Sequence, residues 1–168
     1  MGMTRIRNWT LAVIVCLSVF SCGRTGPDTS SKPNIVFILA DDMGYGDPQC
    51  YNPDSRIPTP NIDRLASDGM MFRDAHSAGA WCVPARYGLM TGQYPGRVQL
   101  NWQERSLVQP NQETLATMLK RNGYHTACIG KWHLGFDNIN WDEPEKNDTL
   151  TGGPVERGFD YFFGMHAS

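Results

Sequence analysis

Two neighbouring carboxylates, Asp41 and Asp42, come directly after a short apolar run, Asn34–Ala40. If both side chains point into one cleft they repel each other, and each raises the pKa of the other unless a cation lies between them. A hard divalent ion such as Ca²⁺ or Mg²⁺ accepts carboxylate oxygens readily. An Asp-Asp pair also occurs in turns and at helix N-caps. The pair alone therefore leaves both a metal site and a structural turn open.

The second group that could do chemistry is Cys82, which is followed by Pro84 and Arg86. Proline favours the first turn of a helix, so we expect a helix to begin at Pro84 with its free N–H groups and positive dipole end near residue 82. That environment favours a thiolate or a bound anion, and the Arg86 guanidinium can bind the same anion with two hydrogen bonds. The alternative is that Cys82 forms a disulfide or is a small buried apolar residue.

A third group, Lys131 and His133, follows a predicted strand at Tyr124–Ile129. An isolated lysine is usually solvated and a histidine beside a tryptophan is usually packed. Their position between two glycines at the end of a strand favours a functional role. Because ligands of open α/β sheets bind beyond the carboxyl ends of the strands, we expect these side chains and the two carboxylates to converge at one edge.

The elements that must position these groups alternate between strands and helices. The run Asn34–Ala40 is apolar and rich in β-branched residues, which predicts a strand covered on both faces. Thr59–Pro60 predicts the start of a helix of about two turns that ends at Gly69. A second helix is expected over Thr114–Arg121, before the strand Tyr124–Ile129. The pattern predicts an α/β fold with a largely parallel sheet and right-handed crossovers.

Length and charge limit the classes of function. The 168 residues suffice for one modest domain, which would bury roughly 70% of its unfolded surface. The chain has 15 basic and 17 acidic residues, a net charge of -2, so it offers no excess positive charge to a nucleic acid or an anionic membrane. Nucleic acid is therefore not an expected partner. With 40% hydrophobic residues the chain should fold, and the aromatic run Phe159–Phe163 should pack in its core.

The first residues predict export. Arg5 and Arg7 give a positive start, Leu11–Phe20 is nearly all apolar, and the small residues Ser21–Gly23 follow, as in a secretory signal. A membrane-spanning helix would need about 20 apolar residues, and this run is half that length. We therefore interpret residues 1–22 as a signal peptide and expect a periplasmic or secreted protein.

The polar segment 23–32, with Gly, Pro and Ser, fits a flexible linker. The residues Val19–Cys22 also resemble a bacterial lipobox, so a lipoprotein anchored to the membrane through Cys22 is the alternative to full secretion. In an oxidising compartment paired cysteines would form disulfides. The remaining three, Cys50, Cys82 and Cys128, are odd in number, so at least one is unpaired or modified.

Four segments resemble the sulfatase family. Cys82–Arg86 (CVPAR) matches the C-x-P-x-R core of that family, and Gly123–His133 (GYHTACIGKWH) looks like its second signature. Asn34–Asp42 and Thr59–Ala66 are similar to its opening strand and first helix. The match covers nearly all of residues 33–168 in order. The resemblance implies the N-terminal part of a sulfatase catalytic domain, with an alkaline phosphatase-like, mixed and largely parallel sheet flanked by helices.

In the family this cysteine is oxidised to Cα-formylglycine, whose hydrated aldehyde is the nucleophile. By resemblance, one diol oxygen of residue 82 attacks the sulfur of a sulfate ester, and the second hydroxyl then expels sulfate and regenerates the aldehyde. The modification implies a partner, a formylglycine-generating enzyme or an anaerobic sulfatase-maturing enzyme. Trp81 and Val83 are bulkier than the residues that usually flank this cysteine, which would slow its modification without excluding it.

The resemblance also implies roles for the other candidates. Asp41, Asp42 and the modified Cys82 would ligate Ca²⁺, with Mg²⁺ as the alternative cation. Arg86 would stabilise the hydrate and the metal site. Lys131 would neutralise charge on the sulfate, and His133 would bind the formylglycine and is the best candidate for proton transfer.

Family members continue well beyond this length, and their later part supplies further metal ligands. We therefore expect a sheet that is incomplete at the C-terminus and a chain that is inactive alone. Three functions stay open: a sulfuric ester hydrolase acting on aryl sulfates or sulfated glycans, another alkaline phosphatase superfamily hydrolase such as a phosphatase or phosphonate hydrolase, and an inactive remnant. A cysteine at the nucleophile position argues against the second, because those enzymes commonly have Ser or Thr there.

Overall fold

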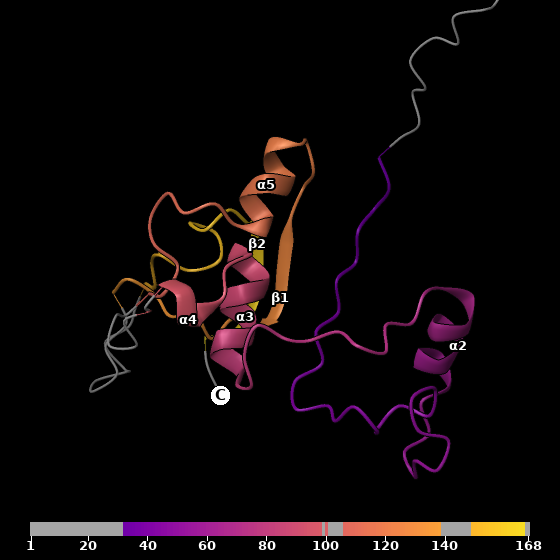
Figure 1. The fold of residues 1–168 in the computed structure, drawn as a ribbon. Helices are drawn as coiled ribbons and strands as arrows, with labels where there is room; N and C mark the ends of the chain where they lie inside the picture. Colours follow the sequence, from indigo (N-terminus) through magenta and orange to yellow (C-terminus); the bar gives the residue numbers. More distant parts are fainter. Residues whose placement is uncertain (1–31, 99, 101–105, 139–148, 167–168) are drawn as a thin grey trace, which may run out of the picture. The chain divides into compact units, whose positions relative to one another are not determined.

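A computed structural model describes residues 32–98, 100, 106–138 and 149–166 of the chain. The chain divides into two units, residues 1–39 and 40–168, and each is described by itself. The elements, all in the second unit, are α2 (Pro60–Asp68), α3 (Cys82–Thr91), α4 (Pro95–Val98), α5 (Leu115–Arg121), β1 (Ala127–Lys131) and β2 (Tyr161–Met165) (Figure 1). The predicted α/β class is confirmed.

The two strands of the described residues form a parallel pair, with Ala127 opposite Tyr161 and Lys131 opposite Met165. The parallel arrangement was predicted, but β1 begins three residues later than the predicted strand and ends two residues later. Gly130 lies opposite Gly164, and a Cβ on Gly164 would overlap the main chain of Gly130. A side chain at that point would therefore push the strands apart.

Two helices start where the sequence predicts. Helix α2 has Pro60 at its first position and ends at Gly69. Helix α5 is capped by Thr114, whose hydroxyl accepts a hydrogen bond from the Thr117 N–H at 3.0 Å, while the Thr117 hydroxyl accepts one from the Thr114 N–H at 2.7 Å. This reciprocal capping satisfies two N–H groups that the first turn leaves free, which explains the sharp start of α5.

The predicted start of α3 is wrong by two residues. The helix begins at Cys82, not at Pro84, with Trp81 as its N-cap and the first helical hydrogen bond from the Ala85 N–H to the Trp81 carbonyl at 3.1 Å. Proline is tolerated throughout the first turn because the N–H groups there have no helical partner. Cys82 therefore lies inside the first turn and not in front of it. At the other end Gly92, with φ of 68°, ends the helix in the left-handed conformation.

The predicted strand at Asn34–Ala40 is not formed. Residues 33–40 are neither strand nor helix in the described part of the chain, and their apolar side chains are exposed, from 45% for Leu39 to 83% for Val36. An apolar β-branched run becomes a strand only where a neighbouring strand pairs with its backbone. The described residues of the first unit, 32–39, contain no such neighbour.

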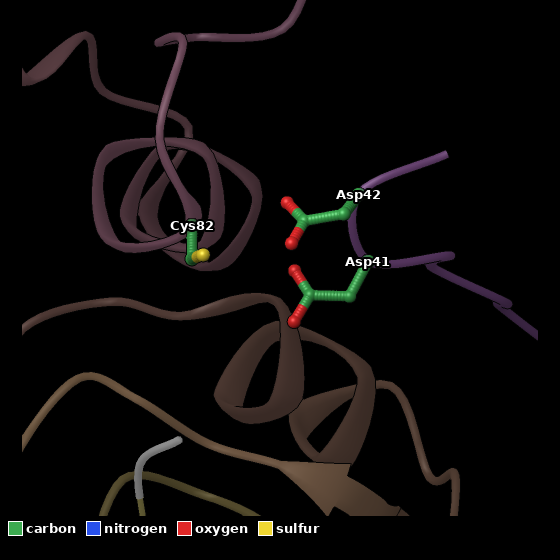
Figure 2. A group of neighbouring side chains, drawn as sticks. All are labelled: Asp41, Asp42 and Cys82. Carbon is green, nitrogen blue, oxygen red and sulfur yellow. The ribbon is translucent and has the colours of Figure 1, made fainter. Parts of the chain in front are cut away.

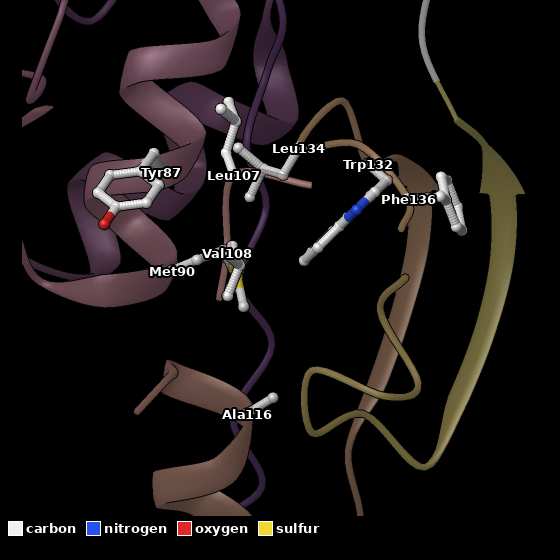
Figure 3. Packing of buried hydrophobic residues seen from close by; sticks show 8 residues of the cluster. All are labelled: Tyr87, Met90, Leu107, Val108, Ala116, Trp132, Leu134 and Phe136. Carbon is white, nitrogen blue, oxygen red and sulfur yellow. The ribbon is translucent and has the colours of Figure 1, made fainter. Parts of the chain in front are cut away.

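One hydrophobic core lies in the second unit. Its buried residues come from α3, α5, the segment 107–108 and the chain that follows β1 (Figure 3): Tyr87, Met90, Leu107, Val108, Ala116, Trp132, Leu134 and Phe136. Phe159 and Phe162 pack against this core, but Tyr161 and Phe163 are 54% and 69% exposed. The prediction that the aromatic run is core holds for only part of it, because side chains alternate across strand β2.

Arg157 is a charged residue inside this core, with 5% of its surface exposed. Its Nε donates to the Val108 carbonyl at 2.6 Å, and its Nη2 donates to Asp137 Oδ1 at 2.7 Å. A buried cation needs such partners. The guanidinium thereby connects its own segment with those of Val108 and Asp137.

The predicted signal peptide, 1–22, and all of the predicted linker 23–32 except Lys32 lie outside the described residues. Within the residues that are described, none of the helices has the length and apolar character needed to cross a bilayer.

Candidate active site

Three charged side chains meet beside Cys82. The Lys131 Nζ lies 2.8 Å from Asp41 Oδ2 and 3.4 Å from Cys82 Sγ. The Arg86 Nη2 lies 3.5 Å from Asp41 Oδ1. The two cationic side chains are nearly buried, at 11% and 12% exposure, whereas the Asp41 side chain is 39% exposed. A half-exposed carboxylate therefore pairs with two cations, and one of these, Lys131, also contacts the thiol.

Asp41, Asp42 and Cys82 form a candidate metal site, with ligand atoms that all lie within 4.8 Å of one another. Figure 2 shows both carboxylates pointing toward the first turn of α3, where the Cys82 side chain lies. Neighbouring side chains in an extended chain point to opposite sides. Asp42 has a φ of 57°, a left-handed conformation that Asp tolerates, and this bend lets consecutive carboxylates share one side.

The donor set fits a hard cation in part. Two carboxylates supply the oxygen ligands that Ca²⁺ and Mg²⁺ prefer, whereas a thiol does not. An oxygen in place of the Cys82 sulfur would complete a set of hard ligands. Arg86 and Lys131 balance the charge of Asp41.

The end of β1 carries Lys131 and His133 into this region. Lys131 is the last residue of the strand, and its carbonyl accepts a hydrogen bond of 2.5 Å from Arg86 Nη1. Gly130 and His133 have positive φ angles of 106° and 56°. Glycine adopts such angles freely, but histidine does so rarely, so the conformation at His133 must be held by its surroundings.

The charges of the site follow from these contacts. The pKa of Asp41 is lowered, first by its hydrogen bond from Lys131, and the pKa of Lys131 is raised, first by the same bond. The pKa of His133 is lowered below 6.5, first by burial and then by the nearby cations Lys131 and Arg86. At neutral pH, Asp41 is therefore ionised, Lys131 is charged, and the His133 imidazole is neutral and can accept a proton.

Two buried nitrogen atoms of the site lack a hydrogen-bond partner within the described residues: Arg86 Nε and His133 Nδ1. A buried polar atom without a partner is costly and calls for an explanation. Arg86 contacts Asp41, and His133 lies within the electrostatic influence of Lys131, Arg86 and Asp41, so a polar ligand at this site would be a suitable partner for both atoms.

The structure brings together most of the predicted site residues. Asp41, Cys82, Arg86 and Lys131 are in direct contact. In the part of the chain that the structure describes, His133 forms no side-chain hydrogen bond to the other candidates, and the charges of Lys131, Arg86 and Asp41 act on its pKa without direct contact. The sequence argument missed the bond from Arg86 to the Lys131 carbonyl, for which the sequence carries no local signal.

The free cysteines also bear on the site. Cys50, Cys82 and Cys128 are all unpaired, so the alternative interpretation of Cys82 as half of a disulfide is wrong in this structure. Burial is the main cause that raises the pKa of the Cys50 and Cys128 thiols. Cys82 is the one free cysteine of the described chain that lies against both a lysine and an aspartate.

Comparisons with known proteins agree with the sequence motifs. A family model described as Sulfatase matches residues 33–168. An N-acetylgalactosamine-6-O-sulfatase of Bacteroides thetaiotaomicron is 41% identical over 148 residues, which cover 83% of this chain and 27% of that protein. The human steryl-sulfatase is 40% identical over 146 residues, 81% of this chain and 24% of that protein.

Solved structures show the same likeness. A structure from work on the metabolism of multiple glycosaminoglycans by Bacteroides thetaiotaomicron has a TM-score of 0.69 and 37% identity, and the match covers 83% of this chain and 29% of that one. The crystal structure of Ps i-CgsB gives a TM-score of 0.63 and 34% identity over 82% of this chain and 29% of that one. The chain thus spans about a quarter of the length of the curated relatives it matches. It belongs to the sulfatase family, with the alkaline phosphatase-like α/β fold of that family.

Proposed function

We propose that the whole protein hydrolyses sulfate esters, with residue 82 as the nucleophile after its thiol is converted to formylglycine. The observation that supports this most strongly is the contact of Cys82 Sγ with Lys131 Nζ at 3.4 Å, in the first turn of α3 and within 4.8 Å of ligand atoms from two carboxylates. A nucleophile beside fixed cations can attack an anionic ester, whose charge the cations offset.

Conversion exchanges the soft sulfur for oxygen. The Cβ–S bond breaks and the sulfur leaves as sulfide, while Cβ loses two electrons and gains the aldehyde oxygen; a formylglycine-generating or anaerobic sulfatase-maturing enzyme supplies the oxidant for this step. Hydration then gives residue 82 two hydroxyl groups. One hydroxyl oxygen attacks the ester sulfur, and the alcohol leaves with a proton as the S–O bond breaks. The second hydroxyl then loses its proton, the bond from Cβ to the sulfate oxygen breaks, and the aldehyde returns with release of sulfate.

The charged residues have separate parts in this cycle. Lys131 and Arg86 are permanently cationic near residue 82, so they would bind the sulfate and stabilise the charge that grows on it. His133 is neutral at pH 7 because burial lowers its pKa. It would therefore accept the proton of the second hydroxyl, and its unpartnered Nδ1 leaves one ring atom available for such a contact.

A divalent cation fits the same group of residues. Asp41, Asp42 and an oxygen of converted residue 82 would hold Ca²⁺ or Mg²⁺ through hard oxygen donors. When bound, the ion would polarise the sulfate and lower the pKa of the attacking hydroxyl. Lys131 and Arg86 hold Asp41 in place through its other contacts.

For the substrate we propose a sulfated glycan. One relative is an N-acetylgalactosamine-6-O-sulfatase and another is a steryl-sulfatase, at nearly equal identity to this chain. Identity alone therefore does not choose between a sugar and a sterol. The likeness to a structure from glycosaminoglycan metabolism, with the higher of the two TM-scores, favours the sugar, and an aryl sulfate serves as the assay substrate.

We also propose that the protein is exported, on the basis of the signal-like segment 1–22. Cleavage after export, or lipid attachment at Cys22, would be read from the mass of the mature N-terminal peptide. A lipid at Cys22 would leave the protein in the membrane fraction, and a Cys22→Ala variant would then move to the soluble fraction.

The proposed reaction is tested by conversion and turnover together. The whole protein is produced with a formylglycine-generating enzyme, and mass spectrometry should find an aldehyde at residue 82 in place of the thiol. Cys82→Ala should abolish turnover of 4-nitrophenyl sulfate, while Cys50→Ala, the control at a second free cysteine, should keep it. Preference for 4-nitrophenyl phosphate would instead assign a phosphatase, and an unmodified thiol under conditions that convert a control sulfatase would refute the proposal.

The cation is tested at the carboxylates. Asp42→Asn keeps the shape of the side chain and removes its charge, so it should weaken Ca²⁺ binding and lower kcat/KM by about 100-fold or more. Asp54→Asn, an exposed aspartate outside the site, is the control and should leave both unchanged. Calcium titration calorimetry measures binding separately from turnover. Equal calcium affinity in the two variants would show that Asp42 is not a ligand of the metal.

A further inference from the structure

We infer that Trp132 is a positioning residue for this site: its buried indole fixes the turn that carries Lys131 and His133. The inference rests on the proposed function for its catalytic consequence. In this role the tryptophan does not contact the substrate. The structural part of the argument depends on the contacts of residues 131–136 with β2, Arg86 and the core, and on those of Lys131 with Asp41 and Cys82.

The indole of Trp132 is anchored in two ways. Only 2% of its surface is exposed, and it packs in the core with Leu134 and Phe136, which are 1% and 5% exposed (Figure 3). Its Nε1–H donates to the Gly135 carbonyl at 2.8 Å. The side chain thus fills the core and also closes the turn 132–135 with its own hydrogen bond.

Burial alternates along the chain that follows β1. Trp132, Leu134 and Phe136 are buried, and the residues between them are only partly buried. Lys131 and His133 are only partly buried, so the inward anchoring at 132 and 134 leaves these two side chains outside the core. There Lys131 meets Asp41 and Cys82.

The main chain around Trp132 is held from both sides. The N–H groups of Trp132 and His133 donate to the carbonyls of Met165 and His166, each at 2.9 Å, and so extend the pairing of β1 with β2. On the other side, the Lys131 carbonyl accepts the 2.5 Å bond from Arg86. The indole and the side chain of Leu134 connect this segment to the core.

The conformation of His133 needs this anchor. Its φ of 56° is unfavourable for a residue with a Cβ, and such conformations persist only where the surroundings determine them. The anchors on either side, Trp132 and Leu134, supply that restraint. Without the indole the turn can relax toward an ordinary conformation, which moves the imidazole and the Lys131 ammonium away from residue 82.

The test compares Trp132→Leu and Trp132→Phe with Val108→Ala, a control in the same core at a residue with 0% exposure. Misplacement of reacting groups by about 1 Å can cost about 100-fold in rate. We expect Trp132→Leu to lower kcat for 4-nitrophenyl sulfate by about 100-fold and to raise the inhibition constant of inorganic sulfate by about tenfold. Trp132→Phe keeps an aromatic ring in the core but cannot donate to the Gly135 carbonyl. It should therefore show a smaller loss of kcat and a smaller rise of the sulfate inhibition constant than Trp132→Leu. Val108→Ala should change both by less than twofold at temperatures well below its Tm.

Two measurements separate positioning from simple loss of folded protein. A smaller folded fraction lowers kcat but leaves the sulfate inhibition constant unchanged. Hydrogen–deuterium exchange should show lost protection at the Trp132 and His133 amides in Trp132→Leu and intact protection in Val108→Ala. Unchanged exchange and unchanged sulfate binding in Trp132→Leu would overturn the inference while leaving the proposed reaction intact. A converted wild-type protein without turnover would instead overturn the proposed function, and the exchange and sulfate-binding measurements would still decide the role of Trp132.

Discussion

Gly88 of α3 sets how closely the segment before Cys82 can approach the helix. A Cβ on Gly88 would lie well under 3.0 Å from the Cβ of Ala78, and a Cβ on Gly79 would lie 2.6 Å from the Cβ of Pro84. Non-bonded carbon atoms pack at about 3.5–4.0 Å. Gly88→Ala therefore forces Ala78 and its neighbours away from α3 by about 1 Å or more. That segment leads directly into Cys82, so the proposed nucleophile is displaced with it.

The expected losses follow from this overlap. Overpacking costs about 1–3 kcal/mol of folding free energy, and the better helix propensity of alanine offsets this by up to about 1 kcal/mol. With the full offset the net destabilisation should be about 0–2 kcal/mol, which leaves a stable protein folded. A displacement of about 1 Å at the nucleophile should lower turnover by about 100-fold. Turnover should therefore fall by about 100-fold, while Tm falls only slightly.

Two variants control this prediction. Gly96→Ala, in α4, meets no atom within 4 Å and should keep both turnover and Tm. The double variant Gly88→Ala with Ala78→Gly removes the methyl group that is overlapped, so it should recover most of the activity. Turnover of 4-nitrophenyl sulfate and thermal unfolding measure the two effects. Equal turnover in Gly88→Ala and Gly96→Ala, or no recovery in the double variant, would refute the reasoning.

Three further predictions concern stability. The pKa of Asp160 is lowered from 3.8 to about 2, first by its hydrogen bond from Lys120. The ionised carboxylate therefore stabilises the fold above pH about 4, and this stabilisation is lost as the pH falls toward 2. Asp160→Asn should accordingly show a smaller fall in Tm between pH 5 and pH 2.5 than the wild-type protein. Arg157→Met should destabilise the fold by about 3 kcal/mol in urea unfolding, because it leaves buried acceptors such as the Val108 carbonyl unpaired; a loss below about 1 kcal/mol would contradict this. The 168-residue chain alone should bind a hydrophobic dye, because large side chains such as Phe163 are 69% exposed, and absence of dye fluorescence would contradict this exposure.

Local signals in the sequence predicted the helices well. The Thr-Pro start of α2 and the Thr114 cap of α5 act within one turn of the chain, so the residues themselves contain the information. The start of α3 was misplaced by two residues because proline is accepted at several positions of a first turn. The strand at 34–40 was wrong for a different reason. A strand requires a partner elsewhere in the chain, and an apolar run does not specify one.

The meeting of the site residues was predicted correctly, although the strand expected to lead into Asp41 is not formed. Asp41 was expected to meet Lys131 at the edge of a shared sheet, and the two side chains do meet, at 2.8 Å, although residues 33–40 form no strand. The motifs that contain Asp41 and Lys131 therefore predicted that these two side chains lie close together, independently of the strand. The left-handed angles at Asp42 and His133 could not be predicted, because neither residue requires them and only the surrounding contacts impose them.

The two sides of the site are held by different forces. Cys82 and Arg86 belong to a helix whose Tyr87 and Met90 are buried in the core, and Lys131 precedes the buried Trp132. Asp41 and Asp42, by contrast, lie in an exposed segment without helix or strand, and ion pairs with the two cations hold Asp41 there. Packing resists salt, whereas exposed ion pairs weaken as ionic strength rises. Cys82, Arg86 and Lys131 should therefore keep their positions at high salt, while the carboxylates that would hold the metal lose theirs, unless a bound divalent ion replaces the ion pairs as their anchor.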